Sequence, residues 1–404
     1  MKRAIVLAGG GAKGGYEMGV WKALRHLNIN YDIVTGTSVG SLTGVLMAQN
    51  DYHKAFKTWY YMDYKKVMDI EIDGKFNTKK GKEEILKKYA KGALAGGYEM
   101  KGLEKVIDGA LDEEKLFSSP IDYGLVTTYF PSFKGKYVKK CNLKKGETKK
   151  YLLASCSCFP AFKPTIIGKN AFVDGGYYDN LPINLAISMG ADEVIAVDMG
   201  AVGLSKNVKD KNIPITYIKP RNDLGNFLAF EKSYARIAIE LGYNDTMKTY
   251  GVLEGNKYTF KKGSLLRNYK RVGTRFYDLY DKYNKNLFNF FKVKKTIVED
   301  KVQTLNKTLE YLAEIYNINP SKIYRTSFLN IKIKKAFLKN KTSSNRKIKG
   351  LIKTKKLKKY FISKELINYI YDELDNRKGR SLGNLKVMFP NAFLCALYLK
   401  TIIR

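Results

Sequence analysis

The fold of this chain is decided by the stretch DIVTGTSVGSL, residues 32–42. Its first part is a short apolar strand, and a run with helical character, residues 41–49, follows at once. A serine between two glycines at such a strand-to-helix turn fits the G-x-S-x-G pattern, because glycines let the strand and helix pass close together. Backbone N–H groups at a helix N-terminus favour a developing negative charge. The pattern makes Ser38 a candidate nucleophile, and an incidental serine in a glycine-rich turn is the alternative.

The preceding residues repeat the same strand–loop–helix order. Residues 5–8 are an unbroken apolar run typical of a buried strand, residues 9–15 are a glycine loop, and residues 16–27 have apolar side chains at helical spacing. This order predicts an α/β fold with a mainly parallel, doubly wound sheet. The first apolar run is too short for a secretory leader, and no run reaches the roughly 18 residues of a spanning helix.

Charge divides the 404 residues into two parts. Residues 1–250 hold 37 Lys and Arg against 27 Asp and Glu, whereas residues 251–404 hold 36 against 11. We therefore expect a globular domain over residues 1–250 and a basic, mostly helical C-terminal region over residues 251–404. The formal charge of +35 implies an anionic partner, either phospholipid headgroups or nucleic acid.

The sequence of the C-terminal region is compatible with three different roles. Residues 331–362 are its most basic segment and contain no acid. Lysine-rich amphipathic helices with many aromatic residues are typical of a membrane-surface module. No nucleic-acid motif is recognisable, so we expect no nucleic acid as partner, although basic charge alone would suit one. A solvated helical domain without a partner is the third reading.

Two further features are a helical segment broken by glycines and the four cysteines. Residues 51–118 have helical patterns broken by glycines and read as an excursion or a cap, which leaves a lid function open. The four cysteines match no disulfide or zinc spacing. We interpret them as reduced thiols of a cytoplasmic protein, for which peripheral association with a membrane stays open.

The glycine loop admits two uses. Gly9-x-Gly11-x-x-Gly14 satisfies the dinucleotide fingerprint, which also requires an acid at the far end of the second strand. Asp32 stands at the start of that strand, so nucleotide binding is disfavoured. The other use is a set of backbone N–H donors aimed at an oxyanion. Neighbouring parallel strands would bring this loop beside Ser38.

A catalytic serine needs a base, and the two histidines are poorly placed for that task. His26 lies on the outward part of the first predicted helix, and His53 follows the far end of the second. Asp174 is the better candidate, because it ends an apolar strand and precedes two glycines that permit a sharp turn. We expect Asp174 at the same sheet edge as Ser38.

Together these blocks resemble the patatin-like phospholipase family. The matching segments are GGGAKG at residues 9–14, GTSVG at 36–40, ASCSCFPAFKP at 154–164 and DGG at 174–176. Cysteine and serine replace the alanines that the family often has around residues 156–158. The resemblance covers roughly residues 1–220 and leaves 251–404 unexplained.

The resemblance implies a three-layer α/β/α fold and a Ser-Asp dyad that hydrolyses lipid esters, such as phospholipids, without a metal or other cofactor. Ser38 would be the nucleophile and Asp174 the general base. The oxyanion site would comprise Gly9, Gly10, Gly11, Lys13, Gly14 and Val39, supported by Gly36, Gly40, Gly175 and Gly176. A lipid-binding or regulatory protein of the same fold, with little turnover, is the alternative. The lipid class and the oligomeric state do not follow from the sequence.

Overall fold

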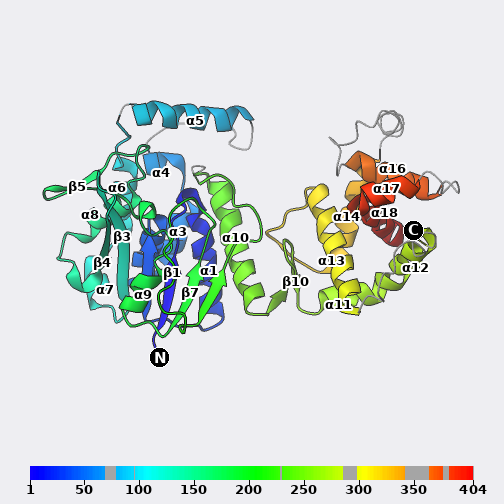
Figure 1. Ribbon diagram of the computed structural model, residues 1–404, viewed down its shortest axis with the longest axis horizontal. Coiled ribbons are helices and arrows are strands. Elements are labelled where there is room, and N and C mark those ends of the chain that lie inside the picture. Colours follow the sequence, from blue (N-terminus) through cyan, green and yellow to red (C-terminus); the bar gives the residue numbers. More distant parts are fainter. Residues whose placement is uncertain are drawn as a thin grey trace. The chain divides into compact units, whose positions relative to one another are not determined.

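A computed structural model describes residues 1–68, 79–94, 96–227, 230–284, 298–341, 364–375 and 382–403 (Figure 1). The chain divides into two compact units, Met1–Thr249 and Tyr250–Arg404. Each unit has its own buried apolar core.

The first unit alternates strands and helices. Its strands are β1 (Arg3–Leu7), β2 (Ile33–Thr37), β3 (Asp122–Phe130), β4 (Gly135–Lys139), β5 (Thr165–Ile167), β6 (Asn170–Asp174), β7 (Glu193–Val197) and β8 (Ile215–Ile218). Its helices are α1 (Gly15–His26), α2 (Val39–Ala48), α3 (Tyr52–Tyr60), α4 (Tyr64–Met68), α5 (Lys79–Leu94), α6 (Lys101–Ala110), α7 (Glu113–Ser118), α8 (Thr148–Cys156), α9 (Ile183–Ser188) and α10 (Lys232–Thr249).

The eight strands form one mixed, mainly parallel sheet. Strands β3, β2, β1, β7 and β8 pair in parallel, whereas β4, β5 and β6 are antiparallel additions at the β3 end. Helix α1 connects β1 to β2, and α2 to α7 lie between β2 and β3, as parallel pairs require, whereas no helix lies in the described segment between β7 and β8. The predicted α/β class with a mainly parallel sheet is confirmed.

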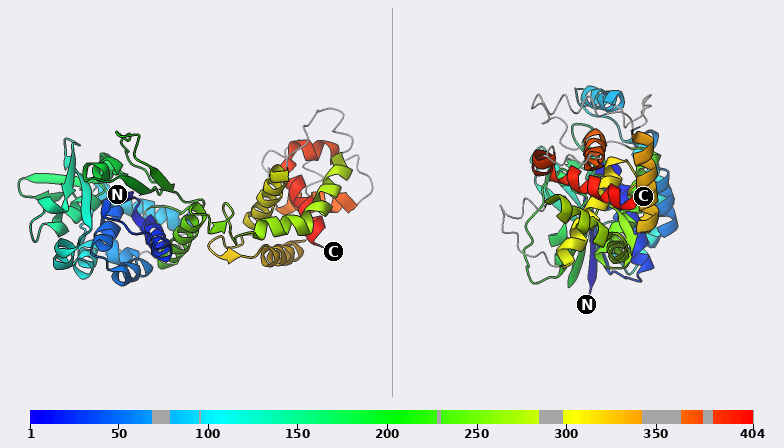
Figure 2. Two further views of the ribbon diagram at one scale, coloured as in Figure 1. Left: turned by 90° about the horizontal axis from the view of Figure 1, so that it is seen from below. Right: turned by 90° about the vertical axis from the view of Figure 1, so that its right-hand side faces the viewer.

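Helices cover both faces of this sheet, which gives three layers (Figures 1 and 2). On one face, α9 packs against a cluster that includes Ala4, Val6 and Ile33. On the other face, α2 lies over Leu7 and Val34, where Gly44 permits close contact. Helices α1, α3 and α10 pack beside α2 on that side. Alternate residues of each strand therefore face opposite helical layers.

Strand β3 brings two strand ends together. Its residues 124–128 pair with β4 along one edge. The other edge is shared, because residues 122–126 pair in parallel with β2 and residues 127–130 pair antiparallel with β6. Strands β2 and β6 thus approach each other end to end. Their last residues, Thr37 and Asp174, pair with the consecutive residues Val126 and Thr127.

This arrangement corrects one sequence-based argument. We expected Asp174 beside Ser38 because both would end strands at the same edge of a parallel sheet. Strand β6 instead runs antiparallel to β3, and Asp174 reaches Ser38 from the opposite direction. The pairing depends on contacts between distant segments, which strand periodicity does not reveal.

Helix α10 begins at Lys232, after a segment that the sequence alone does not distinguish from a helix. Within the preceding segment, the Asp223 carboxylate accepts the Gly225 N–H at 2.8 Å, and Gly225 has φ +80°. This local turn competes with helix formation. Residues 228–229 lie outside the described ranges.

The second unit is mostly helical, as predicted. Its strands are β9 (Leu253–Glu254), β10 (Thr259–Lys261) and β11 (Ile323–Tyr324). Its helices are α11 (Ser264–Asn268), a π-helical turn (Tyr269–Gly273), α12 (Thr274–Asn284), α13 (Val298–Ile315), α14 (Thr326–Asn340), α16 (Lys364–Asp375), α17 (Leu382–Met388) and α18 (Pro390–Ile402). Most of the basic segment 331–362 lies outside the described residues.

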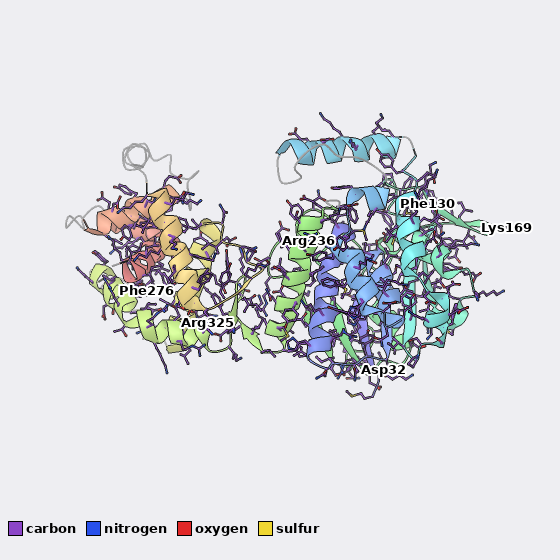
Figure 3. The ribbon with its side chains drawn as sticks, turned by 180° about the vertical axis from the view of Figure 1, so that it is seen from behind. Asp32, Phe130, Lys169, Arg236, Phe276 and Arg325 are labelled. Carbon is purple, nitrogen blue, oxygen red and sulfur yellow. The ribbon has the colours of Figure 1, made fainter. Side chains whose placement is uncertain are left out.

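Helix α18 is the centre of the second unit. It contacts α12, α13, α14, α16 and α17. Phe276 of α12, labelled in Figure 3, is buried in the same core. An apolar helix surrounded by others needs no polar face, which explains the apolar end of the sequence. Among the described helices, none combines the length and apolarity needed to cross a membrane.

Candidate active site

Ser38 occupies a strained turn between β2 and α2. Its backbone has φ 54° and ψ −127°, a conformation that non-glycine residues rarely adopt. The neighbouring glycines permit this turn, because a Cβ on Gly36 would overlap the Gly40 carbonyl oxygen. A Cβ on Gly40 would approach the backbone of Leu7. The serine side chain is thereby held at the end of the sheet.

The Ser38 hydroxyl donates a hydrogen bond to Asp174 Oδ2 at 2.6 Å. The other carboxylate oxygen, Oδ1, accepts the Gly176 N–H at 2.8 Å. These two bonds hold the Asp174 carboxylate against the Ser38 hydroxyl. This geometry suits transfer of the hydroxyl proton to the carboxylate.

Burial controls the charge of Asp174, whose side chain is 7% exposed. Desolvation raises the pKa of this carboxyl to about 6, against the lowering effect of its bonds to Ser38 and Gly176. A carboxylate with a raised pKa is a stronger base than an exposed aspartate, and it is still ionised at neutral pH.

The glycine loop supplies unbonded donors beside Ser38. Within the described ranges, the backbone N–H groups of Gly10, Gly11 and Val39 donate to no other residue. Gly11 has φ +56°, and a Cβ there would overlap the Phe227 carbonyl oxygen, so glycine is required. All three residues line the same cavity as Ser38. The arrangement can hold a negative oxygen near the serine.

The other residues expected in the oxyanion site have different contacts. The Gly9 N–H is occupied, because it donates to the Asn180 carbonyl oxygen at 3.1 Å. Lys13 Nζ lies 3.5 Å from the Met199 carbonyl oxygen, and Gly14 packs against Trp59. Gly9 lines the cavity, whereas Lys13 and Gly14 are not among its described lining residues.

The two histidines and Asp32, which the sequence did not favour as site residues, lie away from Ser38. His26 Nδ1 is 2.6 Å from the Tyr243 hydroxyl, and the His53 ring packs edge-on against Tyr52. Figure 3 shows Asp32 at the end of the sheet opposite Phe130, the last residue of β3. There its carboxylate accepts the Arg3 N–H at 2.9 Å. None of these side chains lines the cavity in the described part of the chain.

The dyad opens into an apolar cavity of about 490 Å³. Asp174 is the one charged residue among its described lining. The lining is Gly9, Gly10, Gly11, Ser38, Val39, Leu42, Trp59, Met62, Val67, Leu103, Cys156, Cys158, Ala161, Phe162, Asp174, Gly176, Tyr177, Asn180, Ala201, Val202, Gly203, Leu204, Phe227 and Phe230. Such a cavity suits an apolar ligand whose polar end lies at Ser38.

Two positioning residues escaped the sequence analysis. Ser155 Oγ accepts the Ser38 N–H at 2.8 Å and donates to the Val126 carbonyl oxygen at 2.7 Å, which ties the elbow to β3. Asn180 Nδ2 donates to the Gly9 carbonyl oxygen at 3.3 Å. Ser155 lies in the ASCSCFPAFKP block, and Asn180 follows the DGG segment by four residues. Their chain positions beside recognised motifs were the signals available.

Two cysteines line the cavity beside the dyad. Burial raises the pKa of both thiols, that of Cys158 to about 12, and the nearby Asp174 charge adds to this effect. Both side chains therefore stay protonated at neutral pH and act as small apolar lining groups. Across the described ranges, no cluster of His, Cys, Asp or Glu could hold a metal ion.

Comparison with protein families gives one match. Residues 5–187 fit the family described as patatin-like phospholipase. This segment contains the glycine loop, the Ser38 elbow and Asp174.

Curated relatives match about half of the chain. Lysophospholipase NTE1 of Mycosarcoma maydis is 29% identical over 212 residues, which are 50% of this chain and 10% of that protein. Patatin-like phospholipase domain-containing protein 7 of Rattus norvegicus is 28% identical over 204 residues, 49% of this chain and 14% of that protein. The match therefore spans a small part of these much longer relatives.

Two solved structures were also matched at 13% sequence identity. The structure of VipD from Legionella pneumophila has a TM-score of 0.41, with coverage of 100% of this chain and 90% of that chain. The structure of the type III effector protein ExoU has a TM-score of 0.33, with coverage of 96% and 80%.

Proposed function

We propose that this chain is a serine acyl hydrolase acting on fatty acyl esters of phospholipids or related lipids, because residues 5–187 fit the patatin-like phospholipase family. The activity would be of the phospholipase A or lysophospholipase type. The observation that carries the proposal is the 2.6 Å hydrogen bond from Ser38 to the buried Asp174 carboxylate, at one end of an apolar cavity.

Acylation is the first half of the proposed reaction. Asp174 accepts the hydroxyl proton while Ser38 Oγ attacks the acyl carbonyl carbon. The oxygen of the tetrahedral intermediate takes the negative charge and is stabilised by the N–H groups of Gly10, Gly11 and Val39. The intermediate then collapses, Asp174 returns the proton to the leaving alcohol oxygen, and the acyl group stays on Ser38.

Deacylation uses the same groups in reverse. Water loses a proton to Asp174 and attacks the acyl-enzyme carbonyl, with the oxyanion again at the glycine loop. The fatty acid leaves, and the proton returns to Ser38 Oγ. No second base is needed, because Asp174 alternates between base and acid.

Two observations support a lipid as substrate. The described cavity walls are mostly apolar, with Asp174 their one charged residue, and they include Trp59, Leu103 and Phe162. Burial of a fatty acyl chain there would gain about 0.8 kcal/mol per methylene group. The printed names of the relatives, lysophospholipase and patatin-like phospholipase, agree with this substrate class.

We also propose that the basic C-terminal region, residues 251–404, acts as a membrane-surface module. Its 36 Lys and Arg against 11 Asp and Glu would attract an anionic bilayer, where each near-surface lysine contributes about 1 kcal/mol. This placement would bring the protein to its lipid substrate.

Labelling with a fluorophosphonate tests the nucleophile without knowledge of the substrate. We expect covalent labelling of Ser38 in the parent chain and its loss in Ser38→Ala and Asp174→Asn. Ser205→Ala, which removes an exposed serine, is the matched control and should label normally. Full labelling or full ester hydrolysis by Ser38→Ala would refute the proposal. Lipid binding without labelling would favour a lipid-binding or regulatory role instead.

A further inference from the structure

Helix α14 (Thr326–Asn340) has two apolar faces, and the second unit explains only one of them. Leu329, Ile333 and Phe337 are fully buried in the core of that unit. They recur at four-residue intervals, so they form one stripe along the helix. This stripe accounts for the attachment of α14 to its neighbours.

The opposite face exposes large apolar side chains to solvent. Phe328, Ile331 and Leu338 are 52%, 50% and 51% exposed. At 3.6 residues per turn, these three positions and Lys332, Lys335 and Lys339 fall within about 120° of the helix circumference. Several large apolar side chains exposed on one helix face are typical of an interaction surface.

The lysines of this face are exposed and carry no ion pair within the described residues. The Lys332 ammonium lies 5.1 Å from the Phe328 ring centre. No Asp or Glu occurs anywhere in α14. The face is therefore apolar and uniformly positive.

We propose that this face of α14 docks on the surface of an anionic lipid bilayer. The helix would lie in the interface, with Phe328, Ile331 and Leu338 inserted among the acyl chains. Lys332, Lys335 and Lys339 lie on the same arc, and their long stems let the ammonium groups reach the phosphates.

Charge and apolarity together select this partner. A single-stranded nucleic acid would engage the lysines and could stack one base on Phe328, but it would gain little from the aliphatic side chains of Ile331 and Leu338. A second copy of the face would bring six lysines together without a countercharge. An anionic bilayer offers acyl chains to the apolar side chains and phosphates to the lysines.

The proposal deepens the proposed function and rests on it for its purpose, since it supplies the contact with a lipid substrate. Binding itself requires no turnover. We therefore place every docking variant in the full chain carrying Ser38→Ala and measure co-sedimentation with vesicles. A failure of hydrolysis leaves this measurement intact, and a failure of docking leaves the fluorophosphonate result intact.

The main comparison changes apolarity at constant charge. The triple variant Phe328→Ser, Ile331→Ser and Leu338→Ser should bind equimolar phosphatidylcholine–phosphatidylglycerol vesicles about tenfold or more weakly. The control triple variant is Val252→Ser, Val387→Ser and Met388→Ser, at positions 43%, 64% and 54% exposed. It removes similar exposed apolar surface elsewhere and should bind like the parent. Equal binding by both triple variants would overturn the proposal.

Two further variants separate docking from damage to the fold. Ile331→Trp should strengthen vesicle binding severalfold, because tryptophan favours the membrane interface. Lys332→Gln, Lys335→Gln and Lys339→Gln together should weaken binding to the mixed vesicles but not to pure phosphatidylcholine. A poly(U) oligonucleotide serves as the competing partner. If the apolar triple variant lost poly(U) binding and kept vesicle binding, nucleic acid would replace the bilayer as occupant.

Discussion

Asp174 is buried beside Ser38, and no cation of the described residues contributes to its pKa. This placement has opposite consequences for catalysis and stability. The carboxyl is 7% exposed, and its two hydrogen bonds come from the Ser38 hydroxyl and the Gly176 N–H. Desolvation therefore raises its pKa, from 3.8 to about 6. Burial therefore makes Asp174 a stronger base. It also makes the charged form of Asp174 less favourable in the folded protein.

Acylation should depend on pH through Asp174. The carboxylate is the form that accepts the Ser38 proton, and the pKa of about 6 places half-protonation there. We expect the rate of fluorophosphonate labelling to rise with pH through about 6 and to level off above about 7. A series of labelling rates between about pH 4 and pH 8, each with a check that the protein remains folded, measures this. A flat profile across that window would exclude Asp174 as the base.

Asp174→Asn should abolish activity and stabilise the fold. The folded pKa exceeds the unfolded value, so the folded state binds the extra proton, and stability due to this group is lost as pH rises through about 6. Above that pH, the buried charge costs up to about 3 kcal/mol. An asparagine avoids this cost and can still accept the Gly176 N–H. Thermal unfolding of parent and variant at pH 8 and at pH 4 should show a higher midpoint for the variant at the first pH only.

Glu17 offers a matched control for that experiment. It is fully buried in α1, and desolvation raises its pKa to about 8. Glu17→Gln should also raise the unfolding midpoint at pH 8, because it removes a second desolvated carboxyl. It should keep fluorophosphonate labelling, which Asp174→Asn should lose. Loss of labelling in both variants would mean that the assay reports packing and not the base.

Among the secondary-structure elements, α8 fixes the elbow at the end of β2. Ser155 of α8 accepts the Ser38 N–H and donates to the Val126 carbonyl oxygen of β3. Ser155→Ala leaves both buried backbone groups without that partner, which costs about 1–3 kcal/mol. We expect a lower unfolding midpoint and slower labelling of Ser38. Ser205→Ala, at an exposed position, should change neither. Unchanged labelling in Ser155→Ala would show that the elbow holds its strained backbone without this bridge.

The elements themselves were largely predictable, but their pairing was not. Strands β1, β2 and β7 follow from short apolar runs, and Ser38 follows from the glycines that flank it. The antiparallel direction of β6 did not follow, because it is set by contacts with β3, about 45 residues earlier in the chain. Ser155 lies in a recognised block, but the bond between its hydroxyl and the Ser38 N–H did not follow, since a serine in a helix has no local signal for a distant backbone donor. Local sequence motifs therefore identified Ser38 and Asp174. The pairing of β6 with β3 determined the direction from which Asp174 approaches Ser38.

The two units differ in what each could reveal from sequence. The first unit carries motifs whose chemistry requires particular residues at particular spacings, so the candidate site could be named before its geometry was seen. The second unit offers charge and periodicity alone. Those properties predicted helices, but burial was needed to distinguish the core stripe of α14 from its exposed face.

Separation of the two units should separate hydrolysis from membrane binding. Every described residue of the cavity lies within Met1–Thr249, and that unit has its own core. Residues 1–250 alone should therefore hydrolyse a short-chain, water-soluble ester within about twofold of the full-chain rate. The same residues carry 37 Lys and Arg against 27 Asp and Glu, compared with 73 against 38 in the full chain. Binding to phosphatidylcholine–phosphatidylglycerol vesicles should fall by about two orders of magnitude, given about 1 kcal/mol for each near-surface lysine.

Both halves of this prediction can fail independently. The assays are ester hydrolysis in the absence of vesicles and co-sedimentation with vesicles, each compared with the full chain. A folded 1–250 chain that has lost hydrolysis would show that the C-terminal region is needed for the active site. Equal vesicle binding by both chains would remove the membrane role of residues 251–404 and move the docking surface to the first unit. There Val202 and Leu204, which line the cavity and are 93% and 61% exposed, would be the residues to substitute next.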